Sequence, residues 1–298
     1  MNSHLLSPIY RTQNLIAGVF LVLLLSLSIG LKAQNANSVL RNLKGNQTFP
    51  SWSPDGRYLL YQSDVFGNQD VFLLDVQTDS VHRLTFAASN EEHPVWVPGK
   101  NAVVYDSKRN GKYHLYLLDL NTGKERLLFH RNVEAREASF TPNRQLVVFS
   151  GLTPVEDSWG IFSYDFVYNN LNTLIRPQGN AGFPVVSPGG RKMVYQLRNV
   201  MNRTIWYQAN WYGDDQQLVN HGSGRPAWSP DAWRLYYAGK DAENWSVYSV
   251  RRNGQSVLRV ATYDSPVSDP AVSPDGKQLA FSLKTKNGWK IQIIKLGN

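Results

Sequence analysis

The sequence predicts an all-β protein, a single six-bladed β-propeller of four-stranded blades. A short motif with a turn proline recurs six times, 42 to 46 residues apart, and no segment after the first 33 residues has the 3.6-residue period of a helix. The motif prolines are Pro54, Pro98, Pro142, Pro188, Pro230 and Pro274. Four-stranded units of about 40–50 residues, repeated radially, are typical of propellers.

Each repeat reads as four strands, and the first repeat shows why. Its first strand carries Trp52, and Ser-Pro-Asp-Gly then forms a tight turn, because proline fixes φ and aspartate bonds the local backbone. The second strand is the apolar run 58–61, and Gly67-Asn68 indicates a hairpin turn. The third and fourth strands are expected at residues 71–75 and 83–86.

Closure of the ring is expected to involve the start of the folded chain. The last repeat ends after its third strand, at residues 291–294, and residues 38–43 resemble the fourth strand of the other repeats. We therefore expect residues 38–43 to complete the sixth blade. An open ring would leave sheet edges exposed.

The first 33 residues are predicted to be a signal peptide. Residues 15–31 are apolar and uncharged, and Lys32-Ala33 precede a polar sequence, so cleavage is expected after Ala33. An uncleaved membrane anchor at residues 15–31 is the alternative. The predicted organisation is a signal peptide or anchor at residues 1–33 and the propeller at residues 34–298, exported to the periplasm or cell envelope.

Composition excludes several classes of protein. The 298 residues contain no cysteine, which excludes disulfides, thiolate metal ligands and a cysteine nucleophile. The net charge is +8, but the basic residues are spread along the chain and form no stripe, so no nucleic-acid partner is predicted. Membrane contact is expected only through the possible anchor.

The repeats resemble those of TolB-type propellers. The resemblance rests on residues 49–57 (Phe-Pro-Ser-Trp-Ser-Pro-Asp-Gly-Arg), on residues 61–64, on Gly67-Asn68 and on residues 71–75, and it extends over all six repeats. It implies the propeller fold and says little about activity. TolB carries an α/β domain before its propeller, and related peptidases carry a hydrolase domain; neither is expected here.

No catalytic motif is found. Gly-x-Ser-x-Gly and His-Glu-x-x-His are both absent, and the histidines occupy different positions within the repeats. We therefore predict no catalytic residues, no metal site and no cofactor. The repeated Asp55, Asp231 and Asp275 are assigned to turn chemistry. The recurring Trp52, Trp96 and Trp228 are assigned to the core between blades.

The candidate binding residues stand just before each predicted first strand, where residue types differ between repeats. They are Phe49, His93, Glu137, Phe183, Arg225 and Asp269. In a propeller the first strand is innermost, so these residues are expected in entry loops at one mouth of the channel, forming an asymmetric funnel. Trp159, in the irregular loop at residues 151–160, is a further candidate contact.

These observations favour a non-catalytic scaffold that binds a protein or peptide in the cell envelope. One alternative is a carbohydrate-active or other small-substrate propeller, in which Glu137 and Asp269 act as paired carboxylates. Another is a subunit of a larger envelope assembly, anchored by residues 15–31.

Overall fold

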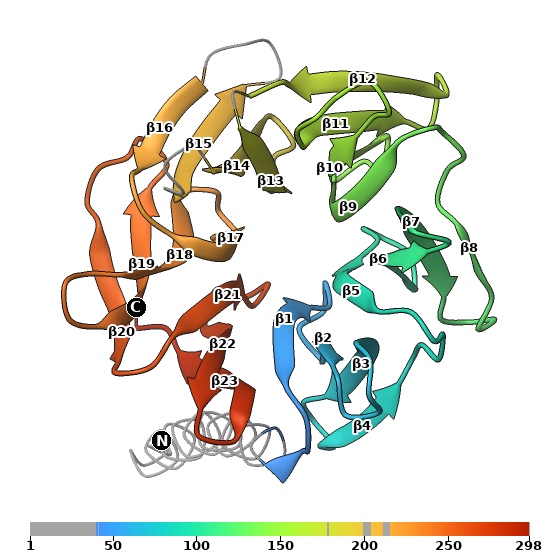
Figure 1. The fold of residues 1–298 in the computed structure, drawn as a ribbon. Helices are drawn as coiled ribbons and strands as arrows, with labels where there is room; N and C mark the ends of the chain where they lie inside the picture. The colour runs from blue at the N-terminus through green and yellow to red at the C-terminus, as the bar shows by residue number, and fades with distance from the viewer. Residues whose placement is uncertain (1–39, 41, 178, 199–203, 211–214, 298) are drawn as a thin grey trace, which may run out of the picture.

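Six antiparallel sheets stand around a ring, with their first strands β1, β5, β9, β13, β17 and β21 innermost (Figure 1). The computed structural model describes residues 40, 42–177, 179–198, 204–210 and 215–297. The predicted signal peptide, its cleavage site and the possible anchor lie outside the described residues. Among the residues described, no helix is long and apolar enough to cross a membrane.

The sheets follow one another along the chain. The first contains β1 (Gln47–Trp52), β2 (Tyr58–Ser63), β3 (Asp70–Asp75) and β4 (Ser80–Arg83); the second contains β5 (Glu91–Trp96), β6 (Ala102–Arg109), β7 (Lys112–Asp119) and β8 (Glu125–Leu127). The third contains β9 (Glu134–Phe140), β10 (Leu146–Leu152), β11 (Gly160–Asp165) and β12 (Asn170–Ile175); the fourth contains β13 (Asn180–Val186), β14 (Lys192–Arg198), β15 (Thr204–Asn210) and β16 (Asp215–Val219). The fifth contains β17 (Ser223–Trp228), β18 (Arg234–Lys240), β19 (Trp245–Arg251) and β20 (Leu258–Tyr263); the last contains β21 (Val267–Val272), β22 (Gln278–Thr285) and β23 (Gly288–Lys295).

The structure is an all-β propeller of four-stranded blades, but the predicted count of six such blades is not supported. Five sheets have four strands, and the sheet β21–β23 has three. The predicted closing strand at residues 38–43 is also wrong. Of that stretch, Leu40 and Asn42 are helical and Leu43 lies in a bend, while residues 38, 39 and 41 lie outside the described residues. The chain turns at Gly45, with φ of 74°, before it enters β1.

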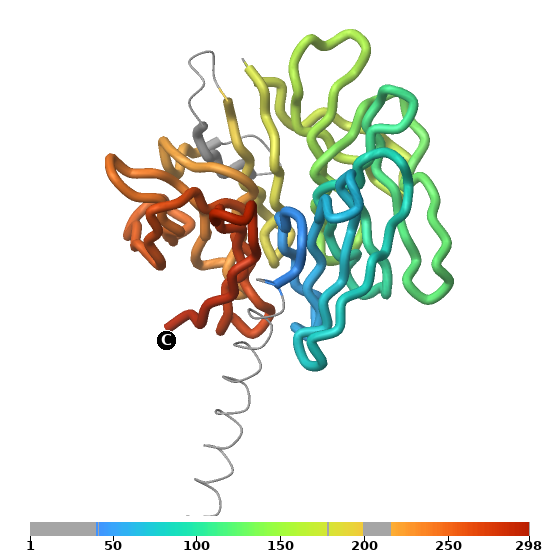
Figure 2. Tube along the Cα trace, turned by 60° about the horizontal axis from the view of Figure 1, so that its bottom comes forward, coloured from blue at the N-terminus to red at the C-terminus, as the bar shows by residue number. Residues whose placement is uncertain are grey.

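The segment at residues 43–46 nevertheless bonds to β23 across the seam between β1 and β23. Lys290 Nζ donates to the carbonyl oxygens of Leu43 and Gly45, at 2.5 and 2.8 Å, and the Trp289 amide donates to Asn46 Oδ1 at 2.8 Å. Leu40 is fully buried in an apolar cluster that includes residues of β1, β2, β22 and β23. In Figure 2 the β1 and β23 ends of the described chain lie side by side.

The turn aspartates are confirmed as structural. Asp55 Oδ1 accepts hydrogen bonds from Ser53 Oγ at 2.6 Å and from the Arg57 amide at 3.0 Å. Asp231 and Asp275 make the same pair of bonds in their own turns. These carboxylates satisfy backbone groups where the hairpin reverses direction.

The tryptophans of the first strands connect neighbouring blades, as predicted. Each indole Nε1 donates to a carbonyl oxygen in the first strand of the preceding sheet: Trp96 to Ser51 at 3.2 Å, Trp228 to Val185 at 3.1 Å, and Trp52 to Ala271 at 3.1 Å. The last of these crosses the seam between the first sheet and the three-stranded sheet. Trp52 therefore contributes to ring closure as well as to the core.

Replacement of Trp52 by phenylalanine tests this seam. The variant loses the hydrogen bond to Ala271 and part of the buried ring, so the free energy of unfolding should fall by about 1–3 kcal/mol. Trp233→Phe is the control, because Trp233 is 58% exposed and should change stability by less than about 0.5 kcal/mol. Equal urea midpoints for Trp52→Phe and the wild type would contradict this role.

Candidate functional site

The six residues predicted from the repeats lie within the innermost strands, at a β-bulge in each. The expectation that they occupy entry loops is therefore wrong. In five strands the bulge residue has φ between 49° and 57°, which is the left-handed region: these residues are Phe49, His93, Glu137, Phe183 and Asp269. In β17 the bulge is one residue longer, and Gly224 takes the positive φ of 70° in place of Arg225. A bulge re-aims the side chain at the point where pairing is interrupted.

Left-handed backbone at a residue other than glycine costs about 1–2 kcal/mol, so these bulges need support. Polar side chains of the preceding blade provide it in three cases. Gln62 Oε1 accepts from the His93 amide at 2.8 Å, Asp106 Oδ1 from the Glu137 amide at 2.9 Å, and Glu137 Oε2 from the Phe183 amide at 2.8 Å. In a fourth case Asp269 Oδ1, in the following blade, accepts from the Arg225 amide at 2.9 Å.

Two of these supporting side chains, Gln62 and Asp106, occupy a place in the repeat that the sequence analysis missed, and polar residues recur there. They follow the buried aromatic residue of each second strand, at Gln62, Asp106, Ser150, Gln196 and Ser282, with Ala238 as the exception. Ser150 donates to Glu137 Oε2 at 2.5 Å, and Ser282 donates to Asp269 Oδ2 at 3.4 Å. The recurring pair of an aromatic and a polar residue was the signal available in the sequence.

The bulges bring the predicted residues together at the ring centre. The Phe49 and His93 ring centroids are 4.3 Å apart, and Phe183 lies 5.9 Å from Phe49 and 5.7 Å from His93. Arg225 Nη2 donates to the Pro50 carbonyl oxygen at 2.6 Å, across the ring from its own blade. The Arg225 guanidinium interacts electrostatically with Asp269 and Glu137. Aromatic rings and paired charges therefore fill this level of the channel.

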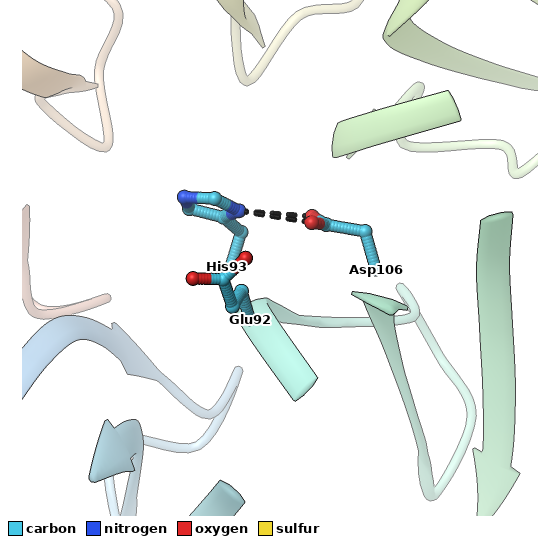
Figure 3. A group of neighbouring side chains, drawn as sticks. All are labelled: Glu92, His93 and Asp106. Carbon is cyan, nitrogen blue, oxygen red and sulfur yellow. Dashed lines mark hydrogen bonds and ion pairs between the residues drawn. The ribbon is translucent and has the colours of Figure 1, made fainter. Parts of the chain in front are cut away.

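His93 and Asp106 form a buried pair at the edge of this cluster. His93 Nδ1 lies 2.9 and 3.2 Å from the two Asp106 carboxylate oxygens, and its second ring nitrogen points away from Asp106 (Figure 3). Burial opposes protonation of the ring, but the charges of Asp106 and Glu137 outweigh it and raise the pKa of His93 above its ordinary 6.5.

Glu92, His93 and Asp106 place one ligand atom each within 4.8 Å of one another, which is compact enough for a metal ion. The Arg136 guanidinium already lies 3.7 Å from Glu92 Oε2 and 3.6 Å from Asp106 Oδ2. A metal would therefore compete with a fixed cation for both carboxylates. The donor set fits an ion-paired network better than it fits a metal centre.

A cavity of about 360 Å³ joins Trp159 to this cluster. Its lining combines aromatic, amide and charged side chains with a short stretch of β13: His93, Arg136, Glu137, Ser150, Trp159, Asn180, Ala181, Gly182, Phe183, Gln196 and Arg198. Of the seven predicted binding residues, the cavity brings together His93, Glu137, Phe183 and Trp159. Phe49 and Asp269 do not line it, although Phe49 packs against His93 and Phe183.

Arg225 lines a second cavity of about 440 Å³, at the far ends of the innermost strands. The walls there are mostly apolar and include Trp52, Trp228 and motif prolines such as Pro98. The first cavity is the more polar of the two, and it contains both arginines and amides. It is the better candidate for recognition of a specific ligand.

One wall of the first cavity is a fixed aromatic and cationic stack. Arg136 Cζ lies 4.2 Å from the Tyr113 ring centroid and 6.0 Å from that of Trp159, and the two rings meet edge to face at 6.3 Å. The Trp159 amide donates to Asn180 Oδ1 at 2.9 Å, which joins the irregular loop of the third sheet to β13. These contacts connect the loop at Trp159 to Arg136 of β9 and to β13.

The two carboxylates proposed as a catalytic pair are both engaged in the fold. Glu137 Oε2 accepts from Ser150 and from the Phe183 amide, and Asp269 accepts from the Arg225 amide and Ser282. Asp269 is 2% exposed; burial raises its pKa, although Arg225 opposes that shift. Both groups therefore hold backbone and polar neighbours in place, and of the two only Glu137 also lines the cavity.

Comparison with known proteins supports a TolB-like propeller. Residues 29–157 match the family model described as the TolB beta propeller domain. No curated protein matches the sequence. The structure is similar to TolB from Acinetobacter baumannii, with a TM-score of 0.67 and 20% identity over 76% of this chain. This chain spans 57% of the length of that protein.

Two other solved structures are similar along most of their length. The putative TolB from Agrobacterium tumefaciens has a TM-score of 0.65 and 19% identity, over 85% of this chain and 91% of its own. Oligogalacturonate lyase from Vibrio parahaemolyticus has a TM-score of 0.60 and 13% identity, over the same shares of the two chains. At these identities the likeness shows the fold alone.

The His93–Asp106 pair predicts a defined dependence of stability on pH. Because the folded-state pKa of His93 is raised, the protonated ring favours the folded state. This contribution is complete below about pH 6.5, the unfolded value, and is lost as the pH rises through the folded value. The stability difference between the wild type and His93→Gln should therefore shrink from pH 6 to pH 9 in urea unfolding.

Asp106→Asn is the matched variant for this test. It keeps an acceptor for the Glu137 amide but removes the charge that raises the pKa of His93. The His Cε1 proton resonance of His93 should then titrate at a lower pH in NMR spectra. A stability difference for His93→Gln that grows with pH would contradict the assignment.

Proposed function

We propose that this chain is an exported TolB-like propeller that acts as a non-catalytic binding scaffold of the cell envelope and holds a protein or peptide at the cavity containing Trp159. The observation that carries the proposal is the set of contacts among Trp159, Tyr113 and Arg136 beside a cavity whose Glu137 carboxylate is hydrogen-bonded within the fold. A preformed cavity with aromatic and amide side chains binds a ligand at low ordering cost.

Export is part of the proposal. It is supported by the uncharged run at residues 15–31 and by the match to the TolB propeller domain. Under this proposal the ring consists of six sheets. The three-stranded sheet β21–β23 is the last of them, and its packing against β1 takes the place of a fourth strand.

A small-substrate enzyme is the second candidate. The feature that favours it is the His93–Asp106 pair, because a carboxylate that fixes a histidine tautomer is a common arrangement for a general base. Oligogalacturonate lyase and a gluconolactonase from Xanthomonas campestris are also among the similar structures. The engagement of Glu137 and Asp269 in hydrogen bonds makes the scaffold the better supported of the two.

Site-specific photocrosslinking tests the scaffold function. A photoreactive phenylalanine analogue at position 159 of the full chain, activated in intact cells, should give one predominant protein adduct by mass spectrometry. The same analogue at position 233, a tryptophan site outside this cavity, is the control and should not give that adduct. Absence of a specific adduct at position 159 would contradict the proposal and turn attention to the enzyme candidate.

A further inference from the structure

We propose that β14 recognises an acidic peptide segment through Gln196 and Arg198. This inference rests on the proposed scaffold function and names the chemistry of its ligand. The first observation concerns Gln196, whose contacts differ from those of the equivalent residues in other sheets.

Gln196 occupies the second-strand place that supports the bulges elsewhere in the ring. Gln62 and Asp106 each accept a hydrogen bond from the bulge amide of the next blade. The corresponding amide in the fifth sheet belongs to Arg225, and it is already bonded to Asp269 from the other side. Among the residues that the structure describes, the side-chain amide of Gln196 has no hydrogen-bond partner, although the residue is only 8% exposed.

Because Gln196 lines the cavity, its side-chain amide can donate to and accept from a ligand there. The cross-strand neighbour of Gln196 in β13 is Gly182, which has no side chain and also lines the cavity. A Cβ atom at position 182 would lie 3.1 Å from Glu137 Oε2, so the Glu137 carboxylate packs against Gly182 and a larger residue there would displace it.

Arg198 adds a charge beside this amide. It lies two residues further along β14, on the same face of the strand as Gln196, opposite Asn180 in the register. Arg136, the other arginine of the cavity, is held by Glu92 and Asp106. Arg198 is exposed and has no ion pair with any described residue, so its charge is available to a ligand.

The Gln196 amide and the Arg198 guanidinium together favour a ligand that carries a carboxylate next to an amide. A primary amide both donates and accepts, which complements a peptide unit, and a guanidinium binds a carboxylate through paired hydrogen bonds. Trp159 and Phe183 supply apolar walls for the intervening side chains. An extended peptide with an acidic side chain meets all three requirements. An acidic oligosaccharide meets the charge requirement but supplies no peptide unit for Gln196.

Fluorescence anisotropy with three labelled probes tests the inference on the full chain. The probes are a decapeptide of alternating Glu and Ala, its counterpart of alternating Gln and Ala, and an oligogalacturonate. The Glu-Ala peptide should bind about tenfold more tightly than the Gln-Ala peptide, and Arg198→Ala should remove that preference. Gln196→Leu should weaken binding of both peptides.

Matched variants separate recognition from folding. Arg126→Ala, on an exposed arginine of β8, should leave the affinity unchanged. Gln196→Leu should keep the thermal midpoint of the wild type, whereas Gln62→Leu, which orphans the His93 amide, should lower it. Equal affinity for the two peptides, or preferential binding of oligogalacturonate through Arg198, would overturn the inference.

The outcome also separates this inference from the scaffold function. A protein adduct at position 159 that persists unchanged in Arg198→Ala and Gln196→Leu would leave the scaffold function standing and refute the acidic-peptide site. Loss of the adduct in both variants, with retained thermal midpoints, would support it.

Discussion

The left-handed bulge of each innermost strand is the constraint on which the ring centre depends. It turns one side chain per blade toward the axis, and in five of the six strands a residue other than glycine adopts this backbone. At three of these five residues, His93, Glu137 and Phe183, a polar side chain of the preceding blade accepts the bulge amide and supports this conformation. The cluster of Phe49, His93 and Phe183 is a consequence of this arrangement, and the candidate cavity forms beside it.

The same logic explains how a ring with a three-stranded sheet can close. Among the residues that the structure describes, no fourth strand pairs with β23, and side-chain contacts connect this sheet to the first one. Lys290 and Asn46 bond across the seam near the outer edge, Trp52 bonds to Ala271 near the axis, and Leu40 fills the apolar layer between them. Single side chains thus connect neighbouring blades both at the bulges and at the seam.

Much of the fold could be predicted from the sequence because its signals are local and repeated. Turn prolines, aspartates and alternating apolar runs predict the strands, and Trp52 and Trp228 were correctly assigned to contacts between blades. Residues 38–43 were assigned wrongly because an apolar alternation cannot distinguish a strand from a helical turn once Gly45 redirects the chain. The candidate residues were found at a shared repeat position, but the cavity depends on the distance between blades, which no local pattern contains. Gln196 can be distinguished from its equivalents Gln62 and Asp106 only by their hydrogen bonds to bulge amides, which the structure shows and the sequence does not.

Native-state hydrogen exchange tests the central claim most directly. The amides of His93, Glu137, Phe183 and Arg225 are bonded to side chains of adjacent blades, so they should exchange only when the whole ring unfolds, with the free energy of global unfolding. Exchange of these four amides by local opening, at rates like those of the exposed hairpin turns, would contradict the claim that contacts between blades hold the bulges and organise the site.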